Sequence, residues 1–310
     1  MSRFVAALFF ALAPLSAFAE VKVLTSIKPL QLIAAAVQDG VGMPDVLLPA
    51  GASAHHYSLR PSDVRAIRSA QLFYWIGPDM ETFLVAPLEG RTGETVAVQS
   101  LDGLTLRYFG QDDHDHDHDH DHDHDHDAHA EHDHNHKPGS LDAHLWLLPS
   151  NAQKIAQRMS EDLAKADPDN AARYQTNLAA FSLRLARLDQ TLKTQLAPIK
   201  DKPYFVFHEA FDYFENAYGL KHAGVFNVGG DAMPGARHVA HMRERLQKIG
   251  QTCVFSEPPV TPKLAQTLTQ GLPATLAELD AMGTQQPVSA KGYEGLLEAL
   301  AASFTQCLAR

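Results

Sequence analysis

The sequence predicts an α/β protein with two α/β lobes, each built on a mainly parallel sheet and joined by one long rigid helix. Strand-like and helix-like segments alternate between residues 20 and 165, and the alternation resumes between residues 198 and 310. Residues 166–197, between the two lobes, carry one unbroken helical pattern. The chain has 310 residues, of which 45% are hydrophobic, and this is enough for two domains with a sizeable core.

In the first lobe, apolar runs alternate with amphipathic stretches. Residues 29–39 are expected to form a helix, because Pro29 stands near its start and Gly40 lies just past its end. Strands are expected at residues 21–27, 45–51, 71–78 and 94–100, with a second helix at residues 60–70 and a third beginning near Asn151. Strands that alternate with helices predict a parallel sheet.

The joining helix is predicted from a single apolar stripe between Pro168 and Leu196. Its members recur at steps of three and four: Tyr174, Leu178, Phe181, Leu185, Leu188, Leu192 and Leu196. A helix of this length would extend ~45 Å at ~1.5 Å per residue, which is long for one domain. A coiled-coil partner would explain it, but the α/β patterns on both sides favour a strut packed against two lobes of the same chain.

In the second lobe, strand and helix patterns again follow one another. Strands are expected within residues 204–208, 221–226, 253–259 and 274–283, and helices follow them at residues 209–219, 235–250, 261–271 and 293–310. Gly250 closes the helix before the third of these strands. The four strand–helix pairs predict a second parallel sheet.

The first nineteen residues are typical of a secretory signal. A positive start, an apolar run too short to span a bilayer and small residues before Glu20 place the cleavage near Ala19/Glu20. No other segment is long and apolar enough to cross a membrane, so we expect a free, exported monomer that is not embedded in a membrane. A nucleic-acid partner is not expected, because the sequence shows no basic patch that would bind one.

The only cysteines are Cys253 and Cys307. An exported protein meets an oxidising compartment, so a disulfide between them is expected, with two buried free thiols as the alternative.

Residues 112–136 consist almost entirely of alternating histidine and aspartate. Their eleven acidic residues, with no lysine or arginine, account for the whole formal charge of −11, so the rest of the chain is close to neutral. Low complexity and like-charge repulsion predict a disordered loop. The loop offers auxiliary weak metal sites at His114, His116, His118, His120, His122, His124, His126, His129, His132, His134 and His136.

Four metal-competent residues fall where predicted strands end or begin: His55, His144, His208 and Asp280. Ligands of α/β sheets collect at the carboxyl ends of the strands. Two of the four residues come from each lobe, and three imidazoles with one carboxylate can close a four-coordinate shell around a divalent cation. We therefore expect a metal site in the cleft between the lobes.

Five stretches in order resemble the zinc-binding proteins of ABC uptake systems, the ZnuA-type members of the metal-specific solute-binding cluster A-I. They are "GASAHHYSLRPSD", "DAHLWLLPSNA", "YFVFHEAFDYFENAYGL", "CVFSEPP" and "TLAELDAMG". The resemblance covers almost the whole mature chain. It implies two lobes bridged by a long helix, a periplasmic location, Zn²⁺ bound in the cleft by His55, His144, His208 and Asp280, and delivery to a cognate ABC membrane permease. A periplasmic zinc chaperone is a further partner to consider.

The same resemblance matches Cys253 and Cys307 to a disulfide of zinc-type members, and the His-rich insertion to that subgroup. Manganese-type relatives have a carboxylate at the place of His208, whereas imidazole suits zinc, copper and nickel. One departure concerns the first loop, where Ala54 stands in place of an acidic residue found in many zinc-type relatives. The fourth ligand is then Asp280 or a water molecule, and His56 is an alternative to His55.

We expect the flexible loop to gather zinc or to sense its abundance, and the folded cleft to bind it more tightly, because a flexible chain loses conformational entropy when it holds an ion. A solvating spacer is the plainer alternative. The remaining histidines are expected to be structural: His222 lies in a predicted strand without an obvious partner, and His238 and His241 lie on a helix face that is expected to be solvated. Glu257 either orients a neighbouring group or contacts a partner.

Other functional classes remain to be weighed against uptake. A periplasmic zinc buffer or metallochaperone would make the loop the main actor, and a secreted adhesin is a weaker alternative. A zinc hydrolase would need an open metal position, but no HExxH motif is present and Asp280 would fill the shell. We therefore expect a protein that is not an enzyme.

Overall fold

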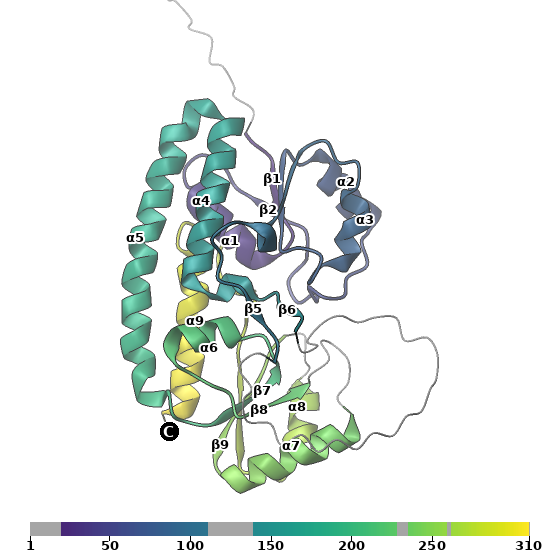
Figure 1. Ribbon diagram of the computed structural model, residues 1–310, viewed down its shortest axis with the longest axis vertical. Helices are drawn as coiled ribbons and strands as arrows, with labels where there is room; N and C mark the ends of the chain where they lie inside the picture. The colour runs from purple at the N-terminus through teal and green to yellow at the C-terminus, as the bar shows by residue number, and fades with distance from the viewer. Residues whose placement is uncertain (1–19, 111–138, 228–234, 259–261, 310) are drawn as a thin grey trace, which may run out of the picture.

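The computed structural model describes residues 20–110, 139–227, 235–258 and 262–309. The expected signal sequence at residues 1–19 and the His/Asp-rich segment at residues 112–136 lie outside the described residues. Figure 1 shows a layer of long helices beside two separate sheets, one in each half of the molecule.

The N-terminal sheet is parallel, with its strands in the order β2-β1-β3-β4. Its strands are β1 (Val23–Thr25), β2 (Asp45–Val46), β3 (Leu72–Trp75) and β4 (Glu94–Ala97). The helices of this half are α1 (Lys28–Val37), α2 (Pro61–Ser69) and α3 (Val85–Leu88). All residues of β1 and β3 are buried, which explains why these strands read as continuous apolar runs rather than as alternating patterns.

A short antiparallel pair interrupts this pattern. Strand β5 (Arg107–Tyr108) pairs with β6 (Leu141–Asp142), and Phe109 N–H donates to the Ser140 carbonyl oxygen at 3.0 Å. This stem therefore holds together the two ends of the segment that contains the His/Asp run. A 3₁₀ turn at Leu145–Leu147 follows and contains Trp146.

Helix α5 (Ala171–Leu196) confirms the predicted long helix. It begins three residues after Pro168, because Pro168–Asn170 form a 3₁₀ turn that connects it to α4 (Pro149–Ala166). Its 26 residues span ~39 Å at ~1.5 Å per residue. The buried stripe consists of Tyr174, Asn177, Phe181, Leu185, Leu188, Leu192 and Leu196.

The C-terminal sheet is also parallel, in the order β10-β9-β7-β8. Its strands are β7 (Tyr204–His208), β8 (Gly224–Asn227), β9 (Thr252–Ser256) and β10 (Ala274–Glu278). Its helices are α6 (Asp212–Tyr218), α7 (Ala236–Ile249), α8 (Pro262–Thr269) and α9 (Gly292–Leu308). The two parallel sheets and the long helix confirm the predicted fold class.

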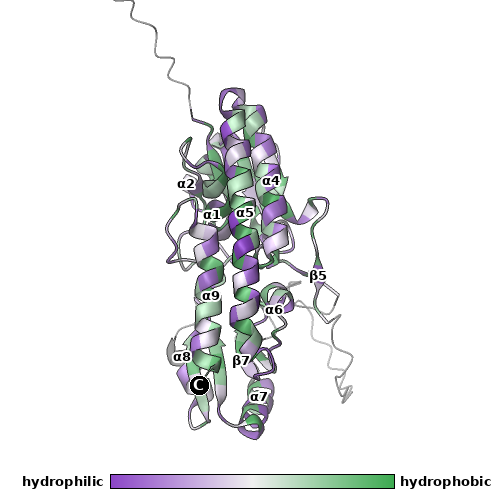
Figure 2. Ribbon diagram, turned by 90° about the vertical axis from the view of Figure 1, so that its left-hand side faces the viewer, coloured by the Kyte–Doolittle hydropathy of each residue, from purple (hydrophilic) through white to green (hydrophobic). Residues whose placement is uncertain are grey.

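Helix α5 contacts α1 and α4 of the N-terminal half and α9 at the end of the chain, and Figure 2 shows α4, α5 and α9 side by side. One apolar cluster continues from β1 through these helices to Tyr204 and Phe304. Side chains on β7 alternate, so Tyr204 belongs to this cluster while Phe205 and Phe207 belong to a second cluster with residues of α7. Of the helices in the described ranges, none combines the length and the apolar character that a bilayer span requires.

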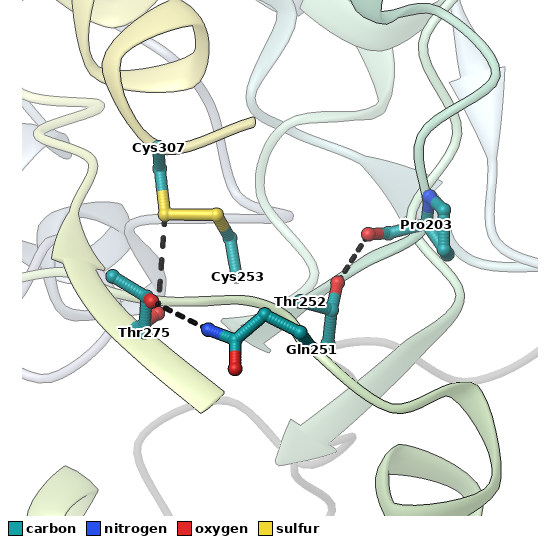
Figure 3. The surroundings of a disulfide bond; sticks show 6 residues. All are labelled: Pro203, Gln251, Thr252, Cys253, Thr275 and Cys307. Atoms are coloured by element: carbon teal, nitrogen blue, oxygen red, sulfur yellow. Dashed lines mark hydrogen bonds between the residues drawn. A yellow bond between two sulfur atoms is a disulfide. The ribbon is translucent and has the colours of Figure 1, made fainter. Parts of the chain in front are cut away.

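A disulfide joins Cys253 of β9 to Cys307 of α9, as expected. Figure 3 shows the bridge beside β10, where Cys307 Sγ lies 3.9 Å from the Thr275 carbonyl oxygen and Gln251 Nε2 donates to Thr275 Oγ1. The bridge therefore fixes the last helix to the middle of the C-terminal sheet.

Glu81 is a fully buried carboxyl group in the N-terminal half. Its Oε2 accepts hydrogen bonds from Ile76 N–H at 2.7 Å and Gly77 N–H at 3.3 Å. Burial raises the pKa of Glu81 to about 7, and these hydrogen bonds only partly oppose the rise.

Loss of the disulfide should destabilise the protein. The bridge closes a sequence separation of 54 residues. In the chain-entropy model this corresponds to about 4 kcal/mol, and measured losses for native bridges are about 2–5 kcal/mol. Urea unfolding of a Cys253→Ser/Cys307→Ser variant should show such a loss, and reductant should lower the stability of the wild type alone. Equal midpoints for variant and wild type would contradict this prediction.

Glu81 should make the stability depend on pH. Because its pKa is raised in the folded state, that state holds the proton more tightly between the ordinary carboxyl range and pH 7, and stability falls as the pH rises through this window. From pH 5 to pH 8, wild type should lose about 2–3 kcal/mol relative to Glu81→Gln, at ~1.36 kcal/mol per pKa unit. Urea unfolding of the metal-free proteins at pH 5 and at pH 8 measures this difference, with the exposed Glu89→Gln as the control. Parallel pH profiles for all three proteins would exclude the effect.

Candidate metal centre

Three histidines from separate parts of the chain meet in the structure. His55 lies in the loop after β2, His144 lies two residues after the end of β6, and His208 is the last residue of β7. Their ring centroids lie 5.5 Å (His55–His144), 5.4 Å (His55–His208) and 5.0 Å (His144–His208) apart. One ring nitrogen from each lies within 4.8 Å of the other two, so these three form a group that could hold a cation.

The first loop selects His55 and not its neighbour. Ser53 Oγ accepts hydrogen bonds from the backbone N–H groups of His55 at 3.1 Å and His56 at 3.2 Å, which closes a tight turn. His55 is 8% exposed and faces the other two rings, whereas His56 is exposed to solvent. Ala54 is buried beside His55 and brings no carboxylate to this side.

A buried carboxylate holds His144. Asp142 Oδ1 lies 2.8 Å from His144 Nδ1 and also accepts from its backbone N–H at 3.0 Å. Burial, followed by the charges of Asp212 and Glu209, raises the pKa of Asp142 well above its usual range. A hydrogen bond from Nδ1 to a carboxylate fixes the tautomer of the imidazole and leaves Nε2 for a cation.

His208 is held in the same way by a neighbouring strand. Its Nδ1 is hydrogen-bonded to Oε1 of Glu257, which follows β9 in the chain. Both side chains are largely buried, with 13% and 10% of their surfaces exposed. Glu257 thus orients a neighbouring group, one of the two roles that the sequence left open for it.

Asp280 is not brought together with the three histidines. Its Oδ1 accepts from the Met282 N–H at 3.0 Å, and its Oδ2 accepts from Thr284 N–H at 2.6 Å and from Thr284 Oγ1 at 2.7 Å. Both carboxylate oxygens therefore serve the turn after β10. The group with metal-ligand spacing contains His55, His144 and His208 without Asp280.

A cavity of about 390 Å³ borders this turn. Residues 46–52 line one side of it, and Pro258, Met282 and Thr284 line the other. It is therefore formed by loops from both sheets, and it lies beside the chain segments that carry His55 and Asp280.

The other histidines described in the structure have separate surroundings. His222, for which the sequence suggested no partner, has its Nδ1 2.9 Å from Glu215 Oε2. His238 was expected on a solvated helix face, but it is partly buried and its Nε2 lies 2.7 Å from the Val225 carbonyl oxygen. His241 is exposed, as expected.

The comparisons with known proteins agree with the geometry. The family model described as "Zinc-uptake complex component A periplasmic" matches residues 23–307. Proteins named "High-affinity zinc uptake system protein ZnuA" are 41% identical in Brucella suis, over 93% of this chain and 92% of the relative, and 41% identical in Haemophilus ducreyi, over 94% of each. A crystal structure of ZnuA shares the fold with a TM-score of 0.73, at 22% identity over 92% of this chain and 99% of that one.

Proposed function

Because the chain belongs to the ZnuA family of periplasmic zinc-uptake components, we propose that it is a periplasmic solute-binding protein that captures Zn²⁺ and delivers it to a membrane ABC permease. The proposal makes the cation a cargo and not the cofactor of a catalytic reaction.

One observation carries the proposal: two imidazoles from loops of the N-terminal half converge with one from the end of β7, and carboxylates hold two of the three. Imidazole nitrogen is a good zinc ligand, at a Zn–N distance of ~2.0–2.1 Å. In a tetrahedral shell the nitrogens would stand ~3.3 Å apart, so atoms within 4.8 Å need only small shifts to reach a common ion.

The fourth position can be filled in two ways. Asp280 would have to release Thr284, whose N–H and Oγ1 both donate to its Oδ2. A water molecule requires no such change, and Ala54 offers no competing carboxylate. We therefore place His55, His144 and His208 as fixed ligands, and Asp280 as a ligand that joins only if the turn after β10 rearranges.

We further propose that the His/Asp run gathers zinc or senses its abundance. Its many alternating donors provide weak, exchangeable sites. In the trio of His55, His144 and His208, by contrast, hydrogen bonds preorganise the rings of His144 and His208. The stem β5–β6 leads from this segment directly to Asp142 and His144, so the segment is tethered next to the proposed site.

Growth in zinc-poor medium tests the proposal. A strain that lacks the gene should grow poorly, and the wild-type gene should restore growth. His208→Ala should fail to restore it, because one of three fixed ligands is lost. A deletion of residues 112–136 should restore growth better than His208→Ala, because it leaves the trio intact.

Zinc titration of the purified proteins supplies the matching control. The deletion should keep one tight site and lose the weak sites of the run, while His208→Ala should weaken the tight site by roughly a hundredfold or more. His241→Ala, which removes an exposed imidazole, should bind as wild type does. Normal growth without the gene would favour a zinc buffer. Loss of the tight site when residues 112–136 are deleted would refute the proposal that this run binds zinc weakly while the three histidines bind it tightly.

Glu257 should contribute to affinity without touching the ion. Glu257→Gln keeps an acceptor for His208 Nδ1 but removes the charge, so zinc affinity should fall by about 10–100-fold. Calorimetric titration of the variant lacking residues 112–136 measures the change, with the exposed Glu278→Gln as the control. Equal affinities for the two glutamine variants would show that Glu257 has no such role.

A further inference from the structure

A second group of potential metal ligands lies next to the trio. Glu209, Asp212 and His222 each offer one ligand atom, and these atoms lie within 4.8 Å of one another. We call this group the α6 cluster. All three side chains are partly exposed, whereas His55 and His144 are buried.

Short connections on both sides of α6 bring the cluster together. Glu209 follows His208 at the end of β7, and Asp212 is the first residue of α6. The chain then turns at Gly219, whose φ of 71° is favourable for glycine, and returns past His222 to β8. Glu209 is therefore one peptide bond away from a residue of the trio.

The imidazole of His222 is oriented as those of the trio are. Its Nδ1 lies 2.9 Å and 3.1 Å from the two oxygens of Glu215, which is 3% exposed and also accepts from Tyr204 O–H at 2.7 Å. Asp142 and Glu257 engage Nδ1 of His144 and His208 in the same manner. A carboxylate on Nδ1 directs Nε2 to the cation in metal sites.

Carboxylates surround His222 and favour positive charge at this place. Burial lowers the pKa of His222, but the carboxylates of Glu215, Asp212 and Glu209 outweigh it and raise the pKa to about 9, so near neutral pH a metal ion must displace a proton from this ring. The charges of Glu209 and Asp212 also raise the pKa of Asp142, so both lie close to the carboxylate that holds His144. The positive charge of Arg107, in β5, lowers the pKa of Asp142.

Helix α6 also rests on the stem of the His/Asp-rich segment. The Tyr213 hydroxyl accepts a hydrogen bond from Arg107 N–H and donates one to the Asp142 carbonyl oxygen, both at 2.9 Å. The α6 cluster is thus adjacent to the stem on one side and to His208 on the other.

We propose that Glu209, Asp212 and His222 form a second site for a divalent cation, with one imidazole nitrogen and two carboxylate oxygens as ligands. This donor set suits Zn²⁺, and it is more exposed than the trio, so it should bind more weakly. The site does not depend on the proposed function, since its ligands are distinct from the trio.

Zinc titration in a background that lacks residues 112–136 and carries His55→Ala and His208→Ala, which leaves one imidazole of the first group, isolates this site. One zinc should still bind. Glu209→Gln and Asp212→Asn should each weaken it at least tenfold while they keep the His222–Glu215 pair, and His222→Ala should abolish it. His241→Ala should have no effect, and urea unfolding should verify that each variant is folded.

Crystals of the full-length mature chain grown with excess zinc provide an independent readout. Anomalous diffraction at the zinc edge should place a peak between Nε2 of His222 and the carboxylates of Glu209 and Asp212. No zinc bound in the isolating background, unchanged binding in the glutamine and asparagine variants, or a peak on other residues would overturn the proposal. A missing site at the trio would instead contradict the proposed function.

Discussion

The burial of one side of α5 is the constraint on which the rest of the structure depends. Its stripe from Tyr174 to Leu196 contacts helices of both halves, so a single apolar core continues from the N-terminal sheet to the C-terminal sheet. Separating the halves would expose this core, and large apolar interfaces resist relative domain motion. The loops with His55 and His144 are therefore held opposite the end of β7 before any ion arrives.

Hydrogen bonds across the two halves refine this arrangement. Trp146 Nε1 donates to the Ala281 carbonyl oxygen at 2.8 Å, and Tyr293 O–H donates to the Trp146 carbonyl oxygen at 2.7 Å. Trp146 packs beside the His144 ring, at 5.4 Å between centroids, and Ala281 adjoins Asp280. These hydrogen bonds connect the turn after β10 to the segment that carries His144. A rearrangement of Asp280 would therefore change the surroundings of the His144 ring.

Periodic patterns predicted the fold because they reflect burial directly. The stripe of α5 and the buried strands of both sheets were visible as apolar spacing, and strand ends pointed to His55, His144 and His208. The hydrogen-bond partners of these rings were not predictable, because whether they meet depends on the path of a loop. Asp142 reaches His144 only through the turn between them, and Glu215 meets His222 only because α6 folds the chain back. Asp280 followed its strand as expected, but its own turn takes up both oxygens.

The negative charge near the trio comes from the carboxylates that hold its rings. Three neutral imidazoles bring no charge to a dication, and Ala54 supplies none from the first loop. Asp142 and Glu257 stand one hydrogen bond behind His144 and His208, and both are largely buried. Burial raises the pKa of Asp142 when no cation is present, and a cation at the rings would favour its ionised form. The proposed Zn²⁺ would then be balanced by two carboxylates that never touch it.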